Sequence, residues 1–172
     1  PSNGNVFAGV QETYGCTECG IFRSINNGES FSNVYENLNE QNVSYNHWKF
    51  TSDGDAFVAS NSYSAELLLK SSNGIDWIPM GSDLNYGSYI NPVSMIITST
   101  NRIIVSSSNY NLNSGVYESL YASDDYGVSW STIATGTSAA QFQAGILQDD
   151  NDIIYGLKYI SATNNGEIAV AE

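Results

Sequence analysis

Few residues in this sequence have the types and spacing that catalysis requires. His47 is the single histidine, and it opens a short apolar stretch beside Trp48, so we interpret it as a structural or surface residue rather than a member of a Ser-His-Asp or Cys-His arrangement. The 18 acidic residues gather mostly in turns and suggest no particular pair of carboxylates facing each other across a cleft, as glycoside hydrolysis needs. The sequence therefore leans toward a protein that is not an enzyme.

Two short clusters could bind metal or form a covalent link. Cys16 and Cys19 form a lone Cys-x-x-Cys, for which we predict a local disulfide; free thiols and a metal site are the alternatives. Asp149, Asp150 and Asp152 offer oxygen ligands and are the candidate calcium site. Because the cluster lacks the glycine and glutamate spacing of an EF-hand, an acidic hairpin turn is the preferred interpretation. No other cofactor is expected.

Composition narrows the class of protein further. The chain has 172 residues, a formal net charge of −13 and only five basic residues, so it cannot offer a basic track to nucleic acid or to an anionic membrane. No apolar run approaches the roughly 20 residues of a transmembrane helix. Aromatic residues make up 12% and charged residues only 13%, a turn-rich composition typical of all-β extracellular proteins. We expect a secreted or cell-surface protein.

The elements that carry these residues are short strands separated by turns. Runs rich in Val, Ile, Tyr and Phe are bounded by Asn-Gly and Asp-Gly turns, and no helical periodicity is present. Two turn markers recur in fixed order about every 40–50 residues, which is the period of a four-stranded propeller blade. We therefore predict one domain, 1–172, with four blades at about 1–40, 41–88, 89–137 and 138–172. The last blade is predicted to contain strands at 142–147, 153–157, 159–161 and 168–171.

The second marker is an eight-residue turn, here called a box turn. Residues 123–130 have the full pattern Ser-x-Asp-x-Gly-x-Ser-Trp, 24–31 have Asn for Asp and Phe for Trp, and 71–77 are one residue short. A degenerate fourth copy is placed at 164–167. In each turn Asp or Asn accepts backbone N–H bonds, Gly supplies a positive φ, and Ser ties the strand ends together. The structural residues are Ser24, Asn26, Gly28, Phe31, Asn73, Gly74, Trp77, Ser123, Asp125, Gly127 and Trp130.

This pattern resembles the Asp-box, or bacterial neuraminidase repeat, of sialidase-like β-propellers. The resemblance implies antiparallel blades of four strands, with Phe31, Trp77 and Trp130 packed between adjacent blades. It also implies, for sialidases, an arginine cluster, a tyrosine nucleophile and an acid/base aspartate. The sequence has only Arg23 and Arg102, so we do not expect sialidase activity of this chain alone.

The function favoured at this point is a non-enzymatic binding, adhesion or structural module. Polar loops at 36–46, 60–65, 81–91 and 106–115 suit a glycan or protein ligand. The alternatives are the non-catalytic part of a larger glycoside hydrolase and a scaffold or subunit of an extracellular filament. Asp-box propellers more often have six or seven blades. In this sequence the first predicted blade also lacks its first strand. We therefore expect a piece of a larger propeller or assembly rather than a closed four-blade unit, with missing blades or self-association covering its edges.

Overall fold

The computed structural model describes residues 4–11, 19–36, 44–61, 68–80, 92–111, 116–136, 140–141, 145–160 and 165–171. Within these ranges every regular element is a β-strand. No helix there is long and apolar enough to cross a membrane. The short strands follow from a sequence of β-branched and aromatic runs interrupted by turn-forming residues.

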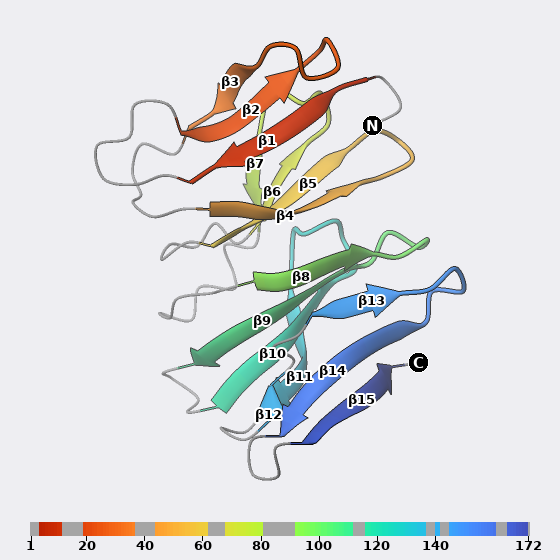
Figure 1. Cartoon of the computed structure of the whole chain (residues 1–172). Helices are drawn as coiled ribbons and strands as arrows, with labels where there is room; N and C mark the ends of the chain where they lie inside the picture. The colour runs from red at the N-terminus through yellow and green to blue at the C-terminus, as the bar shows by residue number, and fades with distance from the viewer. Residues whose placement is uncertain are drawn as a thin grey trace.

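Four antiparallel sheets follow one another along the chain (Figure 1). Sheet 1 contains β1 (Val6–Val10), β2 (Gly20–Ser24) and β3 (Ser32–Tyr35). Sheet 2 contains β4 (Ser44–Phe50), β5 (Ala56–Asn61), β6 (Leu68–Ser71) and β7 (Ile78–Met80). Sheet 3 contains β8 (Pro92–Ile97), β9 (Ile103–Asn111), β10 (Val116–Ser123) and β11 (Ser131–Gly136). Sheet 4 contains β12 (Ala140–Gln141), β13 (Ile146–Gln148), β14 (Ile154–Ile160) and β15 (Asn165–Ala171). The prediction of an all-β chain of antiparallel sheets is confirmed.

Strand register makes the sheets directly comparable. The first serine of each box turn pairs with the residue that opens the neighbouring strand: Ser24 with Val6, Ser71 with Ala56, and Ser123 with Ile103. Because pairing register fixes which face each side chain takes, residues counted from these pairs occupy equivalent positions in the three sheets. On this basis Phe7 is equivalent to Phe57, and Arg23 to Lys70.

Sheet 4 departs from the predicted strand pattern. Residues 154–160 form one strand, β14, instead of two strands at 153–157 and 159–161. The predicted strand at 142–147 has residues 142–144 outside the described ranges; β12 and β13 lie on either side of them and both pair with β14. The prediction of two strands at 153–157 and 159–161 is therefore wrong, since one long strand pairs with β12, β13 and β15. The predicted strand at 168–171 lies within β15.

The fourth box turn was also predicted wrongly. Gly166 and Glu167 lie within β15 and pair with Tyr159 and Lys158 of β14. The Asn-Asn-Gly-Glu sequence thus runs into β15, which pairs with β14 as β10 pairs with β9, whereas the third box turn comes after β10. The physical reason is that Asn-Gly pairs suit any tight hairpin, so these letters alone do not specify which hairpin they close.

Apolar side chains fill the three junctions between successive sheets. The first junction joins sheets 1 and 2, the second joins sheets 2 and 3, and the third joins sheets 3 and 4. Residues along β5 alternate, so that Ala56 and Val58 pack toward sheet 1 while Phe57 and Ala59 pack toward sheet 3. Burying a large apolar side chain of this kind stabilises the fold by about 1.5–3 kcal/mol. We call the face toward the preceding sheet the leading face, and the opposite one the trailing face.

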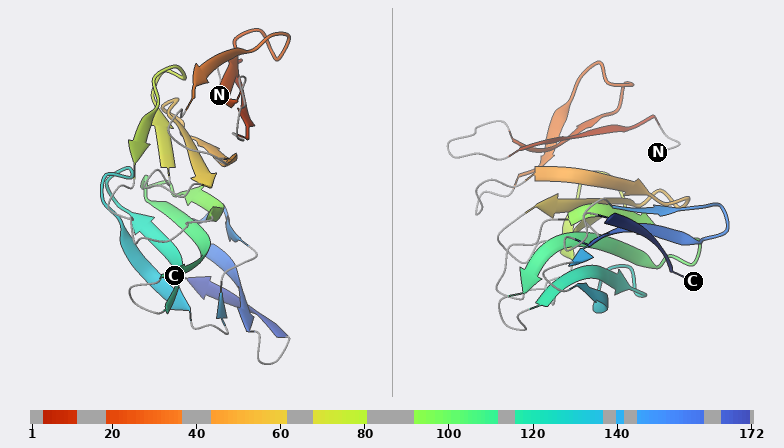
Figure 2. Two further views of the ribbon diagram at one scale, coloured as in Figure 1. Left: turned by 90° about the vertical axis from the view of Figure 1, so that its left-hand side faces the viewer. Right: turned by 60° about the horizontal axis from the view of Figure 1, so that its bottom comes forward.

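The sheets form an open, curved row (Figure 2). Sheet 1, near the N-terminus, lies at one end and sheet 4, near the C-terminus, at the other. Tight turns of one type join β4 to β5, β8 to β9 and β13 to β14. In each, a backbone N–H bonds a carbonyl four residues on: Thr51 to Asp55, Thr98 to Arg102, and Asp149 to Ile153.

Candidate binding site

The third box turn is closed by its own polar side chains. Ser123 Oγ donates to Asp125 Oδ1 over 2.8 Å and accepts from the Gly127 N–H at 2.7 Å. The carboxylate of Asp125 also accepts from Ser129, from the backbone N–H at 2.8 Å and from the hydroxyl at 2.5 Å. The Ser129 bonds, the hydroxyl first, and the Ser123 hydroxyl lower the pKa of Asp125 to about 2. This aspartate therefore has a structural task in the turn.

The other two box turns use asparagine in the same way. Asn26 Oδ1 accepts from Ser24 Oγ at 2.8 Å and from the Ser30 N–H at 3.0 Å. Asn73 Oδ1 accepts from the N–H groups of Ile75 and Asp76, each at 2.8 Å. An amide oxygen thus replaces a carboxylate oxygen without loss of the turn's bonding. The glycine of each turn, Gly74 among them with a φ of 72°, takes a conformation that other L-residues rarely adopt.

The aromatic residues that end the box turns differ in burial. Trp77 is buried at the first junction, with 8% of its surface exposed, and Trp130 is partly buried at the second. Phe31 is 43% exposed, so its predicted place between sheets is wrong within this structure. The reason is directional: Trp77 packs toward sheet 1 and Trp130 toward sheet 2, whereas no sheet of the described residues lies against the leading face of sheet 1.

The remaining candidates for chemistry are dispersed. His47 Nε2 lies 3.1 Å from the Pro92 carbonyl oxygen, and burial of the ring lowers its pKa, an effect that this hydrogen bond partly offsets. Arg23 lies on β2 of sheet 1, and Arg102 precedes β9 of sheet 3, where its Nε is 3.3 Å from the exposed carboxylate of Asp124. The two arginines therefore do not form a cluster.

The acidic turn uses its carboxylates within the protein. Asp149 accepts from the N–H groups of Asn151 and Ile153, each at 2.9 Å, and the Ile153 bond is the main reason for its lowered pKa. Asp152 accepts from Ser99, whose hydroxyl bond is the main cause of its lowered pKa. Asp150 is exposed. No group of three or more metal-ligating His, Cys, Asp or Glu side chains occurs among the residues described, and the calcium site stays a prediction.

Of the two cysteines predicted to form a disulfide, only Cys19 lies within the described residues. Cys19 is buried and disulfide-bonded. Cys16 lies outside the described residues, as do most residues of the four polar loops predicted to hold a ligand. The pairing and the loop sites therefore stay predictions.

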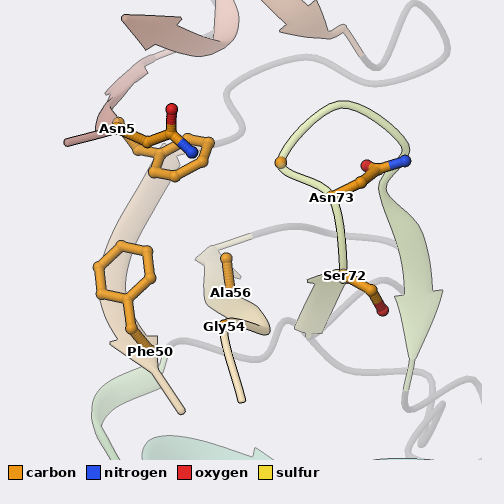
Figure 3. A pocket seen from close by; sticks show the side chains of 8 residues that line it. Asn5, Phe50, Gly54, Ala56, Ser72 and Asn73 are labelled. Carbon is orange, nitrogen blue, oxygen red and sulfur yellow. The ribbon is translucent and has the colours of Figure 1, made fainter. Parts of the chain in front are cut away.

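A small hollow of about 70 Å³ opens at the first junction, close to the second box turn. Its apolar lining comes from Phe7 of β1, Phe50 of β4 and Ala56 of β5, and Phe50 is 40% exposed. Figure 3 shows Asn5 and Phe50 on one side, Ser72 and Asn73 on the other, and Gly54 and Ala56 between them. The remaining lining residue is Gly74. The volume suits one ring or one short side chain, since pockets for drug-sized ligands measure roughly 300–1,000 Å³.

At the second junction the third box turn contributes a tyrosine. Tyr126 of the third box turn stacks on Phe57, with ring centroids 6.0 Å apart, and Lys70 Nζ lies 4.7 Å from the Tyr126 ring centroid. The second box turn is one residue shorter, and the residue it lacks between Asn73 and Gly74 is the one equivalent to Tyr126. Among the described residues, the first junction consequently has Phe7 with no tyrosine of the second box turn stacked on it.

The surroundings of the hollow match those of Tyr126 in other respects. Arg23, equivalent to Lys70, lies beside Gly74: a Cβ at Gly74 would be 3.3 Å from Arg23 Nε and 2.8 Å from Phe7 Cζ. Arg23 Nη2 donates to Asn5 Oδ1 at 3.2 Å. A cation near aromatic faces attracts a further ring, so the site is suited to a planar aromatic group or a sugar ring.

Sequence reasoning missed this hollow although its signal was present. The sequence shows that the box at 71–77 is one residue short. That the shortening leaves a hollow depends on Phe7, which lies at least 64 positions earlier in the chain. The residues Asn5, Phe7, Phe50 and Ala56 were not predicted as site residues. Their proximity follows from sheet stacking, which a turn motif alone does not reveal.

Comparison with known proteins supports the fold and no particular family. No protein family and no curated protein matches the sequence. The chain is similar to a protein of unknown function from Dyadobacter fermentans DSM 18053, with a TM-score of 0.51 and 15% identity over 88% of this chain and 54% of that one. It is also similar to YCF48 bound to D1 peptide, with a TM-score of 0.51 and 11% identity over 96% and 50% of the two chains. YCF48 is a β-propeller. The chain thus has a propeller-type fold and spans about half the length of these solved structures.

Proposed function

We propose that this chain is a non-enzymatic binding module that receives a planar ring in the hollow at the first junction. The observation that carries the proposal is the contrast between two equivalent junctions, one filled by the Tyr126 side chain and the other open. The chain's own tyrosine indicates the chemistry of the ligand. We infer that a tyrosyl or phenylalanyl side chain of a protein partner enters the hollow and stacks on Phe7 near Arg23.

The wider setting is also part of the proposal. The box turns, with their Ser, Asp or Asn, Gly and aromatic residues, support membership of the Asp-box group of propellers. The turn-rich composition, in which only 13% of residues are charged, supports a secreted or cell-surface location. The structure of YCF48 bound to D1 peptide gives a precedent for peptide binding on this fold.

The test is a titration of the protein with N-acetyl-tyrosinamide, followed by NMR of the backbone amides. The expected result is a saturable shift at Asn73, Gly74 and Gly54, with Gly127 at the filled second junction serving as the internal control. N-acetyl-alaninamide should cause none of these shifts, because it lacks the ring. A single-ring fragment should bind weakly, with a Kd of about 1 mM or above, as a hollow this small buries little area.

Methyl glycosides provide the competing outcome. If a pyranoside shifts the same amides and N-acetyl-tyrosinamide does not, the ligand is a glycan and the protein-partner proposal is wrong. If neither probe shifts them, the hollow is not a binding site. Release of the aglycone from any aryl glycoside by this chain would contradict the non-enzymatic assignment.

A further inference from the structure

Both end sheets of the row present apolar side chains to solvent. On the leading face of sheet 1, Val6, Val10 and Phe31 are 40%, 41% and 43% exposed. On the trailing face of sheet 4, Leu147 is 75% and Tyr155 is 36% exposed. Scattered exposed apolar residues are ordinary on protein surfaces, so the question is whether these positions have a defined role.

Register shows that the leading face of sheet 1 is a junction surface. Val6 is equivalent to Ala56 in sheet 2 and to Ile103 in sheet 3, which are 2% and 0% exposed because the preceding sheet covers them. Phe31 is likewise equivalent to Trp77, which is 8% exposed. The same positions that are buried in the interior sheets are thus uncovered only where no sheet precedes them.

The trailing face of sheet 4 is the complementary surface. Tyr155 pairs with Leu147 as Ile104 pairs with Ile96 in sheet 3. Ile96 and Ile104 are 2% and 3% exposed, since they pack against sheet 4 at the third junction. Leu147 and Tyr155 are therefore equivalent to Ile96 and Ile104 of sheet 3, which are buried against the leading face of sheet 4.

We propose that a second copy of this chain docks head-to-tail, its sheet 4 trailing face against the sheet 1 leading face of the first. The second copy is the occupant because each of the three junctions within the chain joins a trailing face to a leading face. The two uncovered end faces are one of each type. The two faces lie at opposite ends of the open row, so no other described sheet of the same copy covers either one (Figure 2). Such a contact uses two different patches and propagates into a ring or a filament.

Charge sets the conditions for this association. Each copy carries a formal charge of −13, and repulsion between copies opposes docking. Salt screens that repulsion, with a Debye length of about 8 Å at 0.15 M and about 3 Å at 1 M. Added NaCl should consequently strengthen the association.

The experiment is multi-angle light scattering of the full chain from low micromolar to millimolar concentration, at low and high NaCl. The expected result is a mass that rises above 18.6 kDa with concentration and rises further with salt. A monomer of 18.6 kDa under every condition would overturn the proposal, including the case in which further blades of a longer polypeptide cover these faces.

Two single variants distinguish head-to-tail docking from other contacts. Phe31→Asp disables the leading face and Leu147→Asp the trailing face; each should be monomeric, because both faces are needed for growth. An equimolar mixture of the two should form a dimer and nothing larger, since one intact face remains on each. Ile78→Asp, on an exposed residue of interior sheet 2 at 60% exposure, is the matched control and should assemble as the wild type does.

The mixture gives the decisive outcome. If the mixture stays monomeric, or if Leu147→Asp still dimerises alone, the contact is not head-to-tail and the proposal is overturned. Equal loss of assembly in Ile78→Asp would indicate unspecific association and would also overturn it. Circular dichroism of each variant confirms that the sheets remain folded.

Discussion

The first and second junctions contain equivalent residues, but the first has an open hollow where the second has a stacked tyrosine. At the second junction Tyr126 lies on Phe57, and Lys70 sits 4.7 Å from the Tyr126 ring centroid and 2.9 Å from Asp55 Oδ2. At the first junction no tyrosine in the described part of the chain stacks on Phe7, whose ring centroid is 5.8 Å from those of Trp48 and Phe50. The difference arises from one residue in a turn. A turn that keeps its serine–glycine hydrogen bond can therefore open or close a site by a change in its length.

The same comparison separates stability from binding. Both turns keep their serine and glycine contacts: the N–H of Gly74 reaches Ser71 Oγ at 2.8 Å and that of Gly127 reaches Ser123 Oγ at 2.7 Å. Folding is thus secured by residues common to the two turns. The proposed ligand site depends on the residue in which the turns differ: Tyr126 is present in the third box turn and has no equivalent in the second.

The largest expected effect is on stability at the first junction. Trp77→Ala should lower the free energy of unfolding by about 3–5 kcal/mol, because it removes a buried indole and leaves a cavity. Trp130→Ala at the second junction should cost less, since Trp130 is only partly buried. Phe31→Ala should change it by about 0.5 kcal/mol or less in the monomer. Urea unfolding measures all three, and equal losses in Trp77→Ala and Phe31→Ala would contradict the assignment of faces.

Deleting Tyr126 should convert the second junction into a copy of the first. The loss of the ring from Phe57 and Lys70 should cost about 2–4 kcal/mol. The shortened turn should open a hollow beside Gly127, so that N-acetyl-tyrosinamide now shifts the Gly127 amide. Tyr126→Phe keeps the ring and serves as the control, with a stability near that of the wild type and no new shift.

The box turns should differ in their response to acid. The pKa of Asp125 is about 2 in the folded protein, below its ordinary 3.8, so its contribution is present above about pH 4 and lost as the pH falls toward 2. Asp125→Asn should make the urea midpoint less dependent on pH in this window, as an amide oxygen serves in the second turn. An unchanged pH dependence in this variant would contradict a structural role for the carboxylate.

The smallest effect concerns His47, a residue of β4 whose ring contacts the Pro92 carbonyl of sheet 3 at the second junction. Because burial lowers its folded pKa, its neutral form stabilises the fold above about pH 6.5, and stability falls as the pH drops below that value. NMR titration of the imidazole should give a midpoint below 6.5. A midpoint above 6.5 would mean that the ring gains a partner on protonation.

Local chemistry was predictable, whereas the relations between sheets were not. The bonds made by Ser123 and Asp125 follow from residue type and spacing within one turn. The exposure of Phe31 depends on whether a sheet lies before it, which its own turn does not encode. Gly166 was wrongly predicted to lie in a turn, because an Asn-Gly sequence does not specify which strands it connects. Strand register places Gly166 within β15, paired with Tyr159. The hollow required Phe7 and Gly74 to be brought together by stacking.

Insertion of one tyrosine between Asn73 and Gly74 tests the central claim most directly. It restores the full turn length and should place a ring on Phe7, where the ligand is proposed to bind. The measurement is the Kd for N-acetyl-tyrosinamide, read from the Asn73 and Gly74 amides in the wild type and the insertion variant. We predict at least a tenfold weaker Kd, a difference of about 1.4 kcal/mol, with the sheets intact by circular dichroism. An unchanged Kd in the folded variant would contradict the account.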